Sequence, residues 1–278
     1  MSRHSMRQRA GRNVTVHLPP GYDEARPDPY PLLVLHDGQN LFASRDEARG
    51  GSWHADEVVD QLVENGGIPP VVIVGIDHAE EERIREFTPT PGTSEPEGGR
   101  AADYSKLVFG VIADVAADHH VRSDPGGLAL GGSSMGGLVT LWMASAFPGR
   151  FGGLIAMSPS IWWDRRAILK ILKRAPIEPT TRIWLDAGAR EGRIVMRDAR
   201  AVRDLLVDQD VRHLRYFEDP DGSHDEASWG RRLGAAQGCA RARDRPHLWA
   251  SAACPRSSGS QITGCGRSLS LLRTAGTY

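Results

Sequence analysis

A glycine-rich segment in the middle of the chain, Gly131 to Gly137, carries the residue types of a nucleophilic serine. It contains the pattern G-x-S-x-G as Gly132-Ser133-Ser134-Met135-Gly136, preceded by the apolar run Leu128–Leu130 and followed by the helical run Leu138–Trp142. A strand, a tight turn and a helix in this order are what a nucleophile elbow requires. The glycines allow a strained turn, and the N-terminus of the next helix favours a developing negative charge. We therefore predict Ser134 as the nucleophile of an acyl transfer.

Two other interpretations of this segment are weaker. A glycine-rich turn without chemistry would explain a bare G-x-S-x-G pattern, but not its place between an apolar run and a helix. A phosphate-binding loop would need a lysine that the segment lacks.

A serine nucleophile needs a general base, and His224 is the candidate. Three histidines follow Ser134 in the chain. His213 lies inside or at the start of an apparent strand, and His247 lies in an irregular tail. His224 lies in the loop 219–224, between the last expected strand and the last expected helix, where an imidazole can reach over the nucleophile. The alternative is a solvated loop histidine without a role.

The base in turn needs an orienting acid, which precedes the histidine in chains with this kind of elbow. Glu191 follows the apolar run Ile183–Leu185 and lies in the loop beyond it, from where a carboxylate can reach the imidazole Nδ1. Asp186 is the reserve candidate for the acid. It ranks below Glu191 because a residue still within the strand is better placed to brace the loop than to reach the imidazole.

Acyl transfer also needs two donors for the oxyanion, usually backbone N–H groups. The segment His36-Asp37-Gly38-Gln39-Asn40 follows the apolar run Leu32–Leu35 and has the required place. We assign the N–H groups of Gln39 and Met135 to this oxyanion hole. An ordinary turn between strand and helix is the alternative.

The elements that must position these residues follow from the pattern of apolar side chains. Short apolar runs closed by turn residues indicate strands buried on both faces; they lie at 32–35, 71–74, 128–130, 154–157 and 183–185. Residues 14–18 alternate apolar and polar side chains before a turn, which is typical of a strand, and residues 214–217 form an apparent last strand. Helical spacing occurs at 52–64, with Ser52 as N-cap and 65–67 as a stop, and at 103–118, 134–147, 194–207 and 226–233. This alternation predicts an α/β fold with a mostly parallel, doubly wound sheet and helices on both faces. The strand at 14–18 is expected near an edge.

The character of the chain changes after residue 233. We expect residues 1–233 to form one catalytic domain and residues 234–278 to form an irregular C-terminal tail, helical at its start or partly disordered. The three cysteines, Cys239, Cys254 and Cys265, all lie in this tail and form neither a disulfide framework nor a CxxC metal motif. His119-His120 and His36-Asp37 do not have the spacing of ligands on one helix face, so we assign no metal.

Composition excludes several classes of partner. The chain has 278 residues, 40% hydrophobic and 25% charged, with a formal net charge of −1 and no long run of one sign. Neither nucleic acid nor an anionic membrane is therefore an expected partner.

No apolar run approaches the roughly 18 residues of a membrane span, and residues 1–12 lack the apolar core of a secretion signal, so a cytoplasmic location is the default expectation. The oligomeric state is not indicated.

Further motifs occur in order between residues 12 and 233. They are Leu18-Pro19-Pro20-Gly21-Tyr22, His36 to Phe42, Pro69 to Ile76, Arg85-Glu86-Phe87-Thr88-Pro89, Ser158 to Trp163, and Gly222-Ser223-His224 with Trp229. With the segment 131–137, they resemble an esterase family of the α/β-hydrolase superfamily that includes enterochelin-type siderophore esterases, feruloyl and acetylxylan esterases and relatives of formylglutathione hydrolase. The resemblance implies an α/β-hydrolase fold and a triad of Ser134, His224 and Glu191. The chain departs from the family in two places: strands ahead of Leu18 are expected to be shortened or absent, and the tail resembles nothing in the family.

The expected activity is that of a serine carboxylesterase acting on a small-molecule ester through an acyl-enzyme, with no cofactor. Trp162 and Trp163 are candidates to line the substrate pocket or to pack in the core, and one in each place is the favoured arrangement. Arg85 is a candidate contact for an anionic substrate, although pairing with a nearby carboxylate is commoner. The acyl group and the alcohol are not indicated. An acyltransferase with the same triad and a catalytically silent binding scaffold remain as alternatives.

Overall fold

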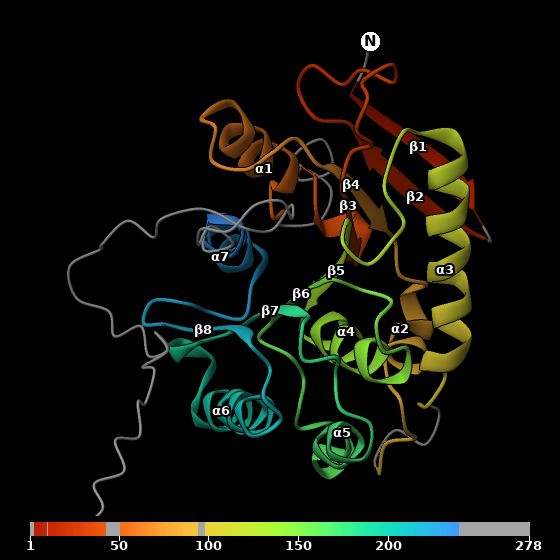
Figure 1. Ribbon diagram of the computed structural model, residues 1–278. Helices are drawn as coiled ribbons and strands as arrows, with labels where there is room; N and C mark the ends of the chain where they lie inside the picture. Colours follow the sequence, from red (N-terminus) through yellow and green to blue (C-terminus); the bar gives the residue numbers. More distant parts are fainter. Residues whose placement is uncertain (1–2, 10, 43–50, 94–97, 239–278) are drawn as a thin grey trace, which may run out of the picture.

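One sheet organises the computed structural model, which describes residues 3–9, 11–42, 51–93 and 98–238 (Figure 1). Within these residues the sheet has eight strands, in the order β1-β2-β4-β3-β5-β6-β7-β8. The pairs β1–β2 and β2–β4 are antiparallel, and the remaining neighbours are parallel. The strands are β1 (His4–Arg9), β2 (Arg12–His17), β3 (Leu32–His36), β4 (Val72–Ile76), β5 (Leu128–Ser133), β6 (Gly153–Met157), β7 (Arg182–Gly188) and β8 (His213–Asp219).

Helices cover both faces of this sheet, as predicted. The helices α3, α4, α5 and α6 contribute to the core on one face, whereas α1 and α7 pack together on the other (Figure 1). The two cores share the sheet by alternation: Leu32 and Val34 of β3 face the first, and Leu33 and Leu35 face the second. The helices are α1 (Ala55–Glu64), α2 (Arg83–Glu86), α3 (Ala101–Asp118), α4 (Met135–Ala146), α5 (Trp163–Arg174), α6 (Arg193–Asp208) and α7 (Glu226–Gly238), with 3-10 turns η1 (Gly38–Asn40), η3 (Glu80–Glu82) and η4 (Ala189–Glu191).

The beginning of the chain corrects one prediction. Strands ahead of Leu18 are not absent, because β1 and β2 form an antiparallel hairpin with Gly11 in the left-handed region at φ 76 between them. The apolar pattern did not predict β1 because this edge strand carries one apolar side chain, Met6, which is 62% exposed. Its arginines Arg7 and Arg9 form ion pairs with Asp118 at the end of α3. The strand β2 lies next to the edge, as expected.

The start of α1 and the existence of α5 also differ from the predictions. The helix α1 begins at Ala55 with His54 as its N-cap, and Ser52 Oγ instead accepts the His54 N–H at 3.1 Å, ahead of the helix. The predicted stop is confirmed, since Asn65 is the C-cap. The helix α5 was not predicted. Residues 164–166, near its start, have φ between 42 and 67, so the right-handed helix is interrupted there.

The last described helix continues past the domain boundary expected after residue 233. The helix α7 reaches Gly238, so the chain is helical for five residues beyond that point. The rest of the expected tail, with the three cysteines and His247, lies outside the described residues. In the part of the chain that the structure describes, no helix combines the length and the apolar character needed to cross a lipid bilayer.

Candidate active site

Ser134 lies on the strained turn between β5 and α4. Its backbone has φ 56 and ψ −118, an uncommon conformation for a residue with a side chain, and it is the N-cap of α4. The turn is held because the Ser134 N–H donates to the carbonyl of Met157 at 2.9 Å. A Cβ on Gly132 would lie 3.0 Å from the backbone of Gly136, so the tight turn requires glycine here. This is the geometry that the sequence predicted for a nucleophile elbow.

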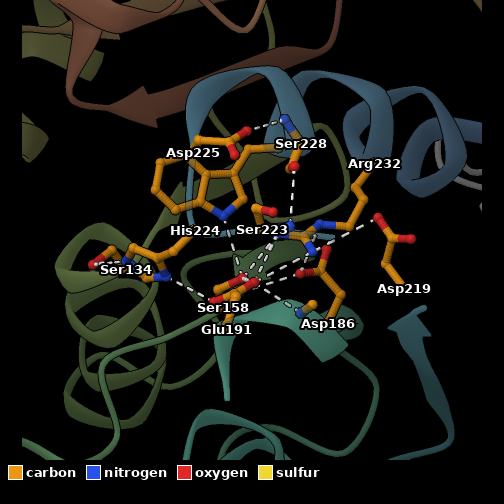
Figure 2. Close-up of polar contacts among 12 residues, drawn as sticks. Ser134, Ser158, Asp186, Glu191, Asp219, Ser223, His224, Asp225, Ser228 and Arg232 are labelled. Carbon is orange, nitrogen blue, oxygen red and sulfur yellow. Dashed lines mark hydrogen bonds and ion pairs between the residues drawn. The ribbon is translucent and has the colours of Figure 1, made fainter. Parts of the chain in front are cut away.

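Two loops bring His224 and Glu191 to this serine (Figure 2). His224 Nε2 lies 3.0 Å from Ser134 Oγ, and His224 Nδ1 lies 2.7 Å from Glu191 Oε2. With Glu191 ionised, Nδ1 carries the proton, and Nε2 presents its lone pair to the serine hydroxyl. The ring edge of Trp229 in α7 packs against the imidazole, with centroids 4.9 Å apart. The hydrogen bonds thus connect residues 134, 224 and 191, which are the three that the sequence analysis selected.

Glu191 ends η4, directly after β7, and its side chain has no exposed surface. Its second oxygen, Oε1, accepts hydrogen bonds from Ser158 Oγ at 2.5 Å and from the Gly188 N–H at 2.8 Å. Burial is the largest influence on the carboxyl and raises its pKa. The hydrogen bonds from His224, Ser158 and Gly188, with the charge of Arg232, outweigh burial and hold the pKa of Glu191 below its ordinary value. The carboxylate is therefore ionised when it faces the imidazole.

Arg232 of α7 lies beneath the acid and was not predicted from the sequence. Its side chain is 2% exposed and reaches from α7 toward the carboxylates of Glu191, Asp186 and, at 3.9 Å, Asp219, as Figure 2 shows. Its Nη2 lies 2.9 Å from Ser158 Oγ and 3.3 Å from Glu191 Oε1, and its Nε lies 3.3 Å from Asp186 Oδ1. No local sequence pattern distinguishes this arginine from Arg231, which precedes it on the exposed side of the same helix.

Asp186 lies inside β7 and braces the neighbouring loop, which is the role the sequence suggested for the reserve acid. Its side chain is fully buried and accepts the Trp184 Nε1–H at 2.7 Å and the Ser158 N–H at 3.2 Å. Burial raises the pKa of Asp186 to about 6, although Arg232 and these hydrogen bonds act in the opposite direction. Ser158, which follows β6, has φ 42 and donates its hydroxyl to Glu191, so a second strained serine supports the catalytic acid.

The loop after β3 packs against the first turn of α4. A Cβ on Gly136 would lie 3.3 Å from Asp37 Oδ2, and a Cβ on Gly38 would lie 2.6 Å from the backbone carbon of Gly75. Asp37 is held by two hydrogen bonds of 2.7 Å from Arg83. The buried side chain of Gln39 fixes the 3-10 turn η1 because its Oε1 accepts the His78 N–H at 3.1 Å.

This packing brings together the two segments that carry the predicted oxyanion donors. Met135 is the first residue of α4, so its N–H has no acceptor within the helix. Gln39 lies in η1, directly after the Asp37-Gly38 turn that contacts α4.

A second serine, Ser160, lies near Ser134, and the sequence does not indicate a role for it. Ser160 Oγ lies 3.2 Å from Ser134 Oγ, and the Ser160 N–H donates to the Ser134 carbonyl at 2.9 Å. The sequence indicates no role for the two serines of the segment Ser158 to Trp163 beyond their place in a family motif. Its two serines support the acid and the elbow, which the spacing within the motif does not reveal.

The two tryptophans of this motif have different surroundings, and Trp163 takes the core position expected for one of them. Trp162 is 50% exposed, whereas Trp163 is buried in the core and donates its Nε1–H to the Thr90 carbonyl at 2.9 Å. Arg85 forms an ion pair with Glu82 at 2.5 Å, which is the alternative to a substrate contact.

A mostly parallel sheet, a strained serine between β5 and α4, and an acid and a histidine on the loops after β7 and β8 define an α/β hydrolase. A family model described as "Putative esterase" matches residues 5–239. The chain belongs to this family, and it is a carboxylic-ester hydrolase.

Similar proteins include esterases of iron-chelating siderophores. The chain is 27% identical over 243 residues to the iron(III) salmochelin esterase of Escherichia coli O6:H1, a match that covers 81% of this chain and 54% of that protein. It is 29% identical over 176 residues to the ferri-bacillibactin esterase BesA of Bacillus subtilis, covering 57% of this chain and 58% of BesA. The crystal structure of the enterobactin esterase FES from Shigella flexneri, in the presence of enterobactin, has a TM-score of 0.67 at 25% identity and covers 85% of this chain and 57% of FES. The matched regions span a little more than half the length of these relatives.

Proposed function

We propose that this chain hydrolyses carboxylic esters through an acyl-enzyme on Ser134, with His224 as general base and Glu191 as the orienting acid. The observation that carries this proposal is the unbroken series of hydrogen bonds from Ser134 Oγ through both ring nitrogens of His224 to Glu191. An ionised, buried carboxylate at Nδ1 orients the imidazole and stabilises the imidazolium that forms when Nε2 takes the serine proton.

The reaction then has two steps. Ser134 Oγ attacks the ester carbonyl while its proton moves to His224 Nε2, and the same proton passes to the departing alcohol as the tetrahedral intermediate collapses. Water, deprotonated by His224, attacks the acyl-enzyme and releases the acid. We assign the backbone N–H groups of Met135 and Gln39 to the oxyanion of both intermediates, since their segments pack against each other beside Ser134.

The substrate class that we propose is an ester of a hydroxylated or phenolic acid of the siderophore type. The named relatives are esterases of salmochelin and bacillibactin, and the similar crystal structure is of an enterobactin esterase. Two features of this chain suit a bulky aromatic substrate. The His224 side chain is 43% exposed, so the site opens to solvent, and the half-exposed ring of Trp162 lies two residues after Ser160, which contacts the nucleophile.

The test compares the wild type with Ser134→Ala and with Ser133→Ala, a matched change one residue away. Initial rates are measured on p-nitrophenyl acetate, butyrate, octanoate and ferulate and on enterobactin with and without Fe³⁺. We expect Ser134→Ala to lose at least about 10³-fold in kcat/KM and Ser133→Ala to stay close to the wild type. The profile over the substrates tests the proposed class, because preference for short acetyl esters would contradict a siderophore-type substrate.

A covalent readout separates the mechanism from the rates. A fluorophosphonate should add one label to Ser134 in the wild type, detected by mass spectrometry of peptides, and none to the Ser134→Ala variant. A folded wild type without label and without turnover would instead support a binding scaffold. Faster transfer of the acyl group to an added alcohol than to water would support an acyltransferase.

A further inference from the structure

A second cluster of polar side chains lies away from Ser134, where the N-terminal hairpin meets α1. His4 of β1 and His17 of β2 are directly paired in the antiparallel register, so their side chains project on the same face of the sheet. Asp56 and Asp60 are four residues apart in α1 and share one face of that helix. Strand pairing and helix packing thus bring four residues together that are up to 56 positions apart in the chain.

The distances within this cluster are close to those of ligands around one ion. His4 Nε2 lies 3.1 Å from His17 Nδ1 and 3.1 Å from Asp56 Oδ2, and the three ligand atoms all lie within 4.8 Å of one another. Ligands at about 2.0–2.2 Å from a tetrahedral zinc ion are separated by about 3.3–3.6 Å. A small outward movement of these side chains therefore makes room for an ion between them.

The surroundings of His17 resemble the outer shell of a metal site. Its Nε2 lies 2.9 Å from Asp60 Oδ1, so Nε2–H donates to the carboxylate and Nδ1 presents its lone pair to the cluster. Metal-binding histidines almost always donate their other N–H to a carboxylate, a carbonyl or water, which fixes the ring and raises its basicity. Asp60 is held in turn by an ion pair with Arg3.

The burial and the charge of the cluster also favour a cation. The side chains of His17 and Asp56 are 1% and 8% exposed, and Phe42 covers the imidazoles, with its ring centroid 5.4 Å from that of His4. The two aspartates bring two negative charges to this place, and Arg3 supplies one positive charge. The His4 side chain is 29% exposed, which leaves a side open to solvent for entry of an ion and for a water ligand.

We propose that His4 Nε2, His17 Nδ1 and Asp56 bind one divalent transition-metal ion, with Zn²⁺ as the best fit, and that this ion fastens the N-terminal hairpin to α1. Two imidazoles and one carboxylate are a donor set that zinc accepts, whereas calcium and magnesium prefer oxygen ligands alone. The sequence does not indicate this set of ligands, because they are separated by 13 and 39 residues and have no motif spacing; the pairs considered there were His119-His120 and His36-Asp37.

The test uses the full chain, with thiols blocked by N-ethylmaleimide so that Cys239, Cys254 and Cys265 cannot bind the ion. After removal of metal with a chelator, the protein is titrated with Zn²⁺ by calorimetry and with Co²⁺ by visible absorption. We expect one equivalent of Zn²⁺ to bind, a tetrahedral or five-coordinate Co²⁺ spectrum, and a rise in the Tm on addition of Zn²⁺.

Three variants locate the site. His4→Ala changes a partly exposed residue of an edge strand and should abolish stoichiometric binding, whereas Asp60→Asn should weaken it about 10-fold through the loss of the outer-shell carboxylate. His54→Ala, at the start of the same helix but outside the cluster, is the matched control and should bind as the wild type does. Circular dichroism confirms that each variant is folded. Absence of stoichiometric Zn²⁺ binding in the wild type, or equal affinity in His4→Ala, would overturn the proposal.

Discussion

Arg232 is a buried cation between two buried carboxylates, and Arg232→Met removes its charge while keeping an unbranched side chain. The guanidinium nitrogens lie 3.3 Å from Glu191 Oε1 and 3.3 Å from Asp186 Oδ1. At an effective dielectric constant of about 20, each such pair has an attraction of about 5 kcal/mol. Part of this attraction offsets the desolvation of the three groups. Because removal of one partner leaves the others buried without compensation, we expect the free energy of unfolding to fall by about 3–5 kcal/mol at pH 7.

The loss of stability in Arg232→Met should depend on pH in a defined direction. Arg232 helps to hold the pKa of Glu191 below its ordinary value, so ionised Glu191 stabilises the wild-type fold above that ordinary value and the contribution is lost as the pH falls. Without the cation, burial raises the pKa of Glu191, and the pKa of Asp186, already about 6, rises further. Protonation then relieves the buried charge. The difference in the free energy of unfolding between the wild type and Arg232→Met should therefore narrow as the pH falls from 8 to 5. The acidic limb of the variant's kcat/KM profile should move to higher pH.

Urea unfolding at pH 5, 7 and 8 and the kcat/KM profile on a p-nitrophenyl ester measure these two effects. Arg231→Met is the matched control, because Arg231 precedes Arg232 on the exposed side of α7. Arg232→Lys keeps the charge and should restore part of the profile. The reasoning is refuted if Arg232→Met is within about 0.5 kcal/mol of the control, the range typical of surface changes, and has an unchanged acidic limb.

Three further predictions concern the same site. Glu191→Gln should lower kcat/KM by about 10⁴-fold, measured on p-nitrophenyl butyrate, because an amide no longer selects the imidazole tautomer or stabilises the imidazolium; a loss below 10-fold would assign the acid elsewhere. Gly38→Ala places a Cβ 2.6 Å from the Gly75 backbone, which should displace η1 and lower kcat by about 10²–10³-fold. An unchanged kcat in the folded variant would contradict the assignment of the Gln39 N–H to the oxyanion hole. Trp163→Ala should cost about 3–5 kcal/mol of stability, as core aromatics do, whereas Trp162→Ala should leave urea unfolding unchanged and raise KM for ferulate more than for acetate. Equal KM changes for the two esters would exclude a contact between Trp162 and the aromatic ring.

The parts of the site that the sequence predicted are those with local signals. The signal for the elbow around Ser134 is local, because an apolar run, glycines and a helical run follow one another within residues 128–142. His224 followed from elimination, because its loop lies between a predictable strand and a predictable helix. The choice of Glu191 over Asp186 depended on where β7 ends, and the strand continues to Gly188, which keeps Asp186 inside it.

The parts that it did not predict depend on contacts between distant elements. Arg232 has the same type as its neighbour Arg231, and only the packing of α7 against α1 and the core of the sheet buries one and exposes the other. Ser158 acquires its role because β6 and β7 are neighbours in the sheet, which aligns it with the acid. The strand β1 carries polar residues at an edge, so neither apolar alternation nor a continuous apolar run distinguishes it from a loop.

The polar character of β1 has a consequence for the behaviour of the protein at high concentration. An exposed edge strand offers unpaired backbone groups to other chains, and charged side chains on that edge discourage such pairing. Arg7 and Arg9 lie on β1 and are fixed by ion pairs with Asp118. If β1 alone detached from β2, β2 would become the edge and would present Val14 and Val16, both now buried. The first strand therefore protects the sheet against edge-to-edge aggregation, and conditions that loosen it should favour aggregates before the rest of the fold is lost.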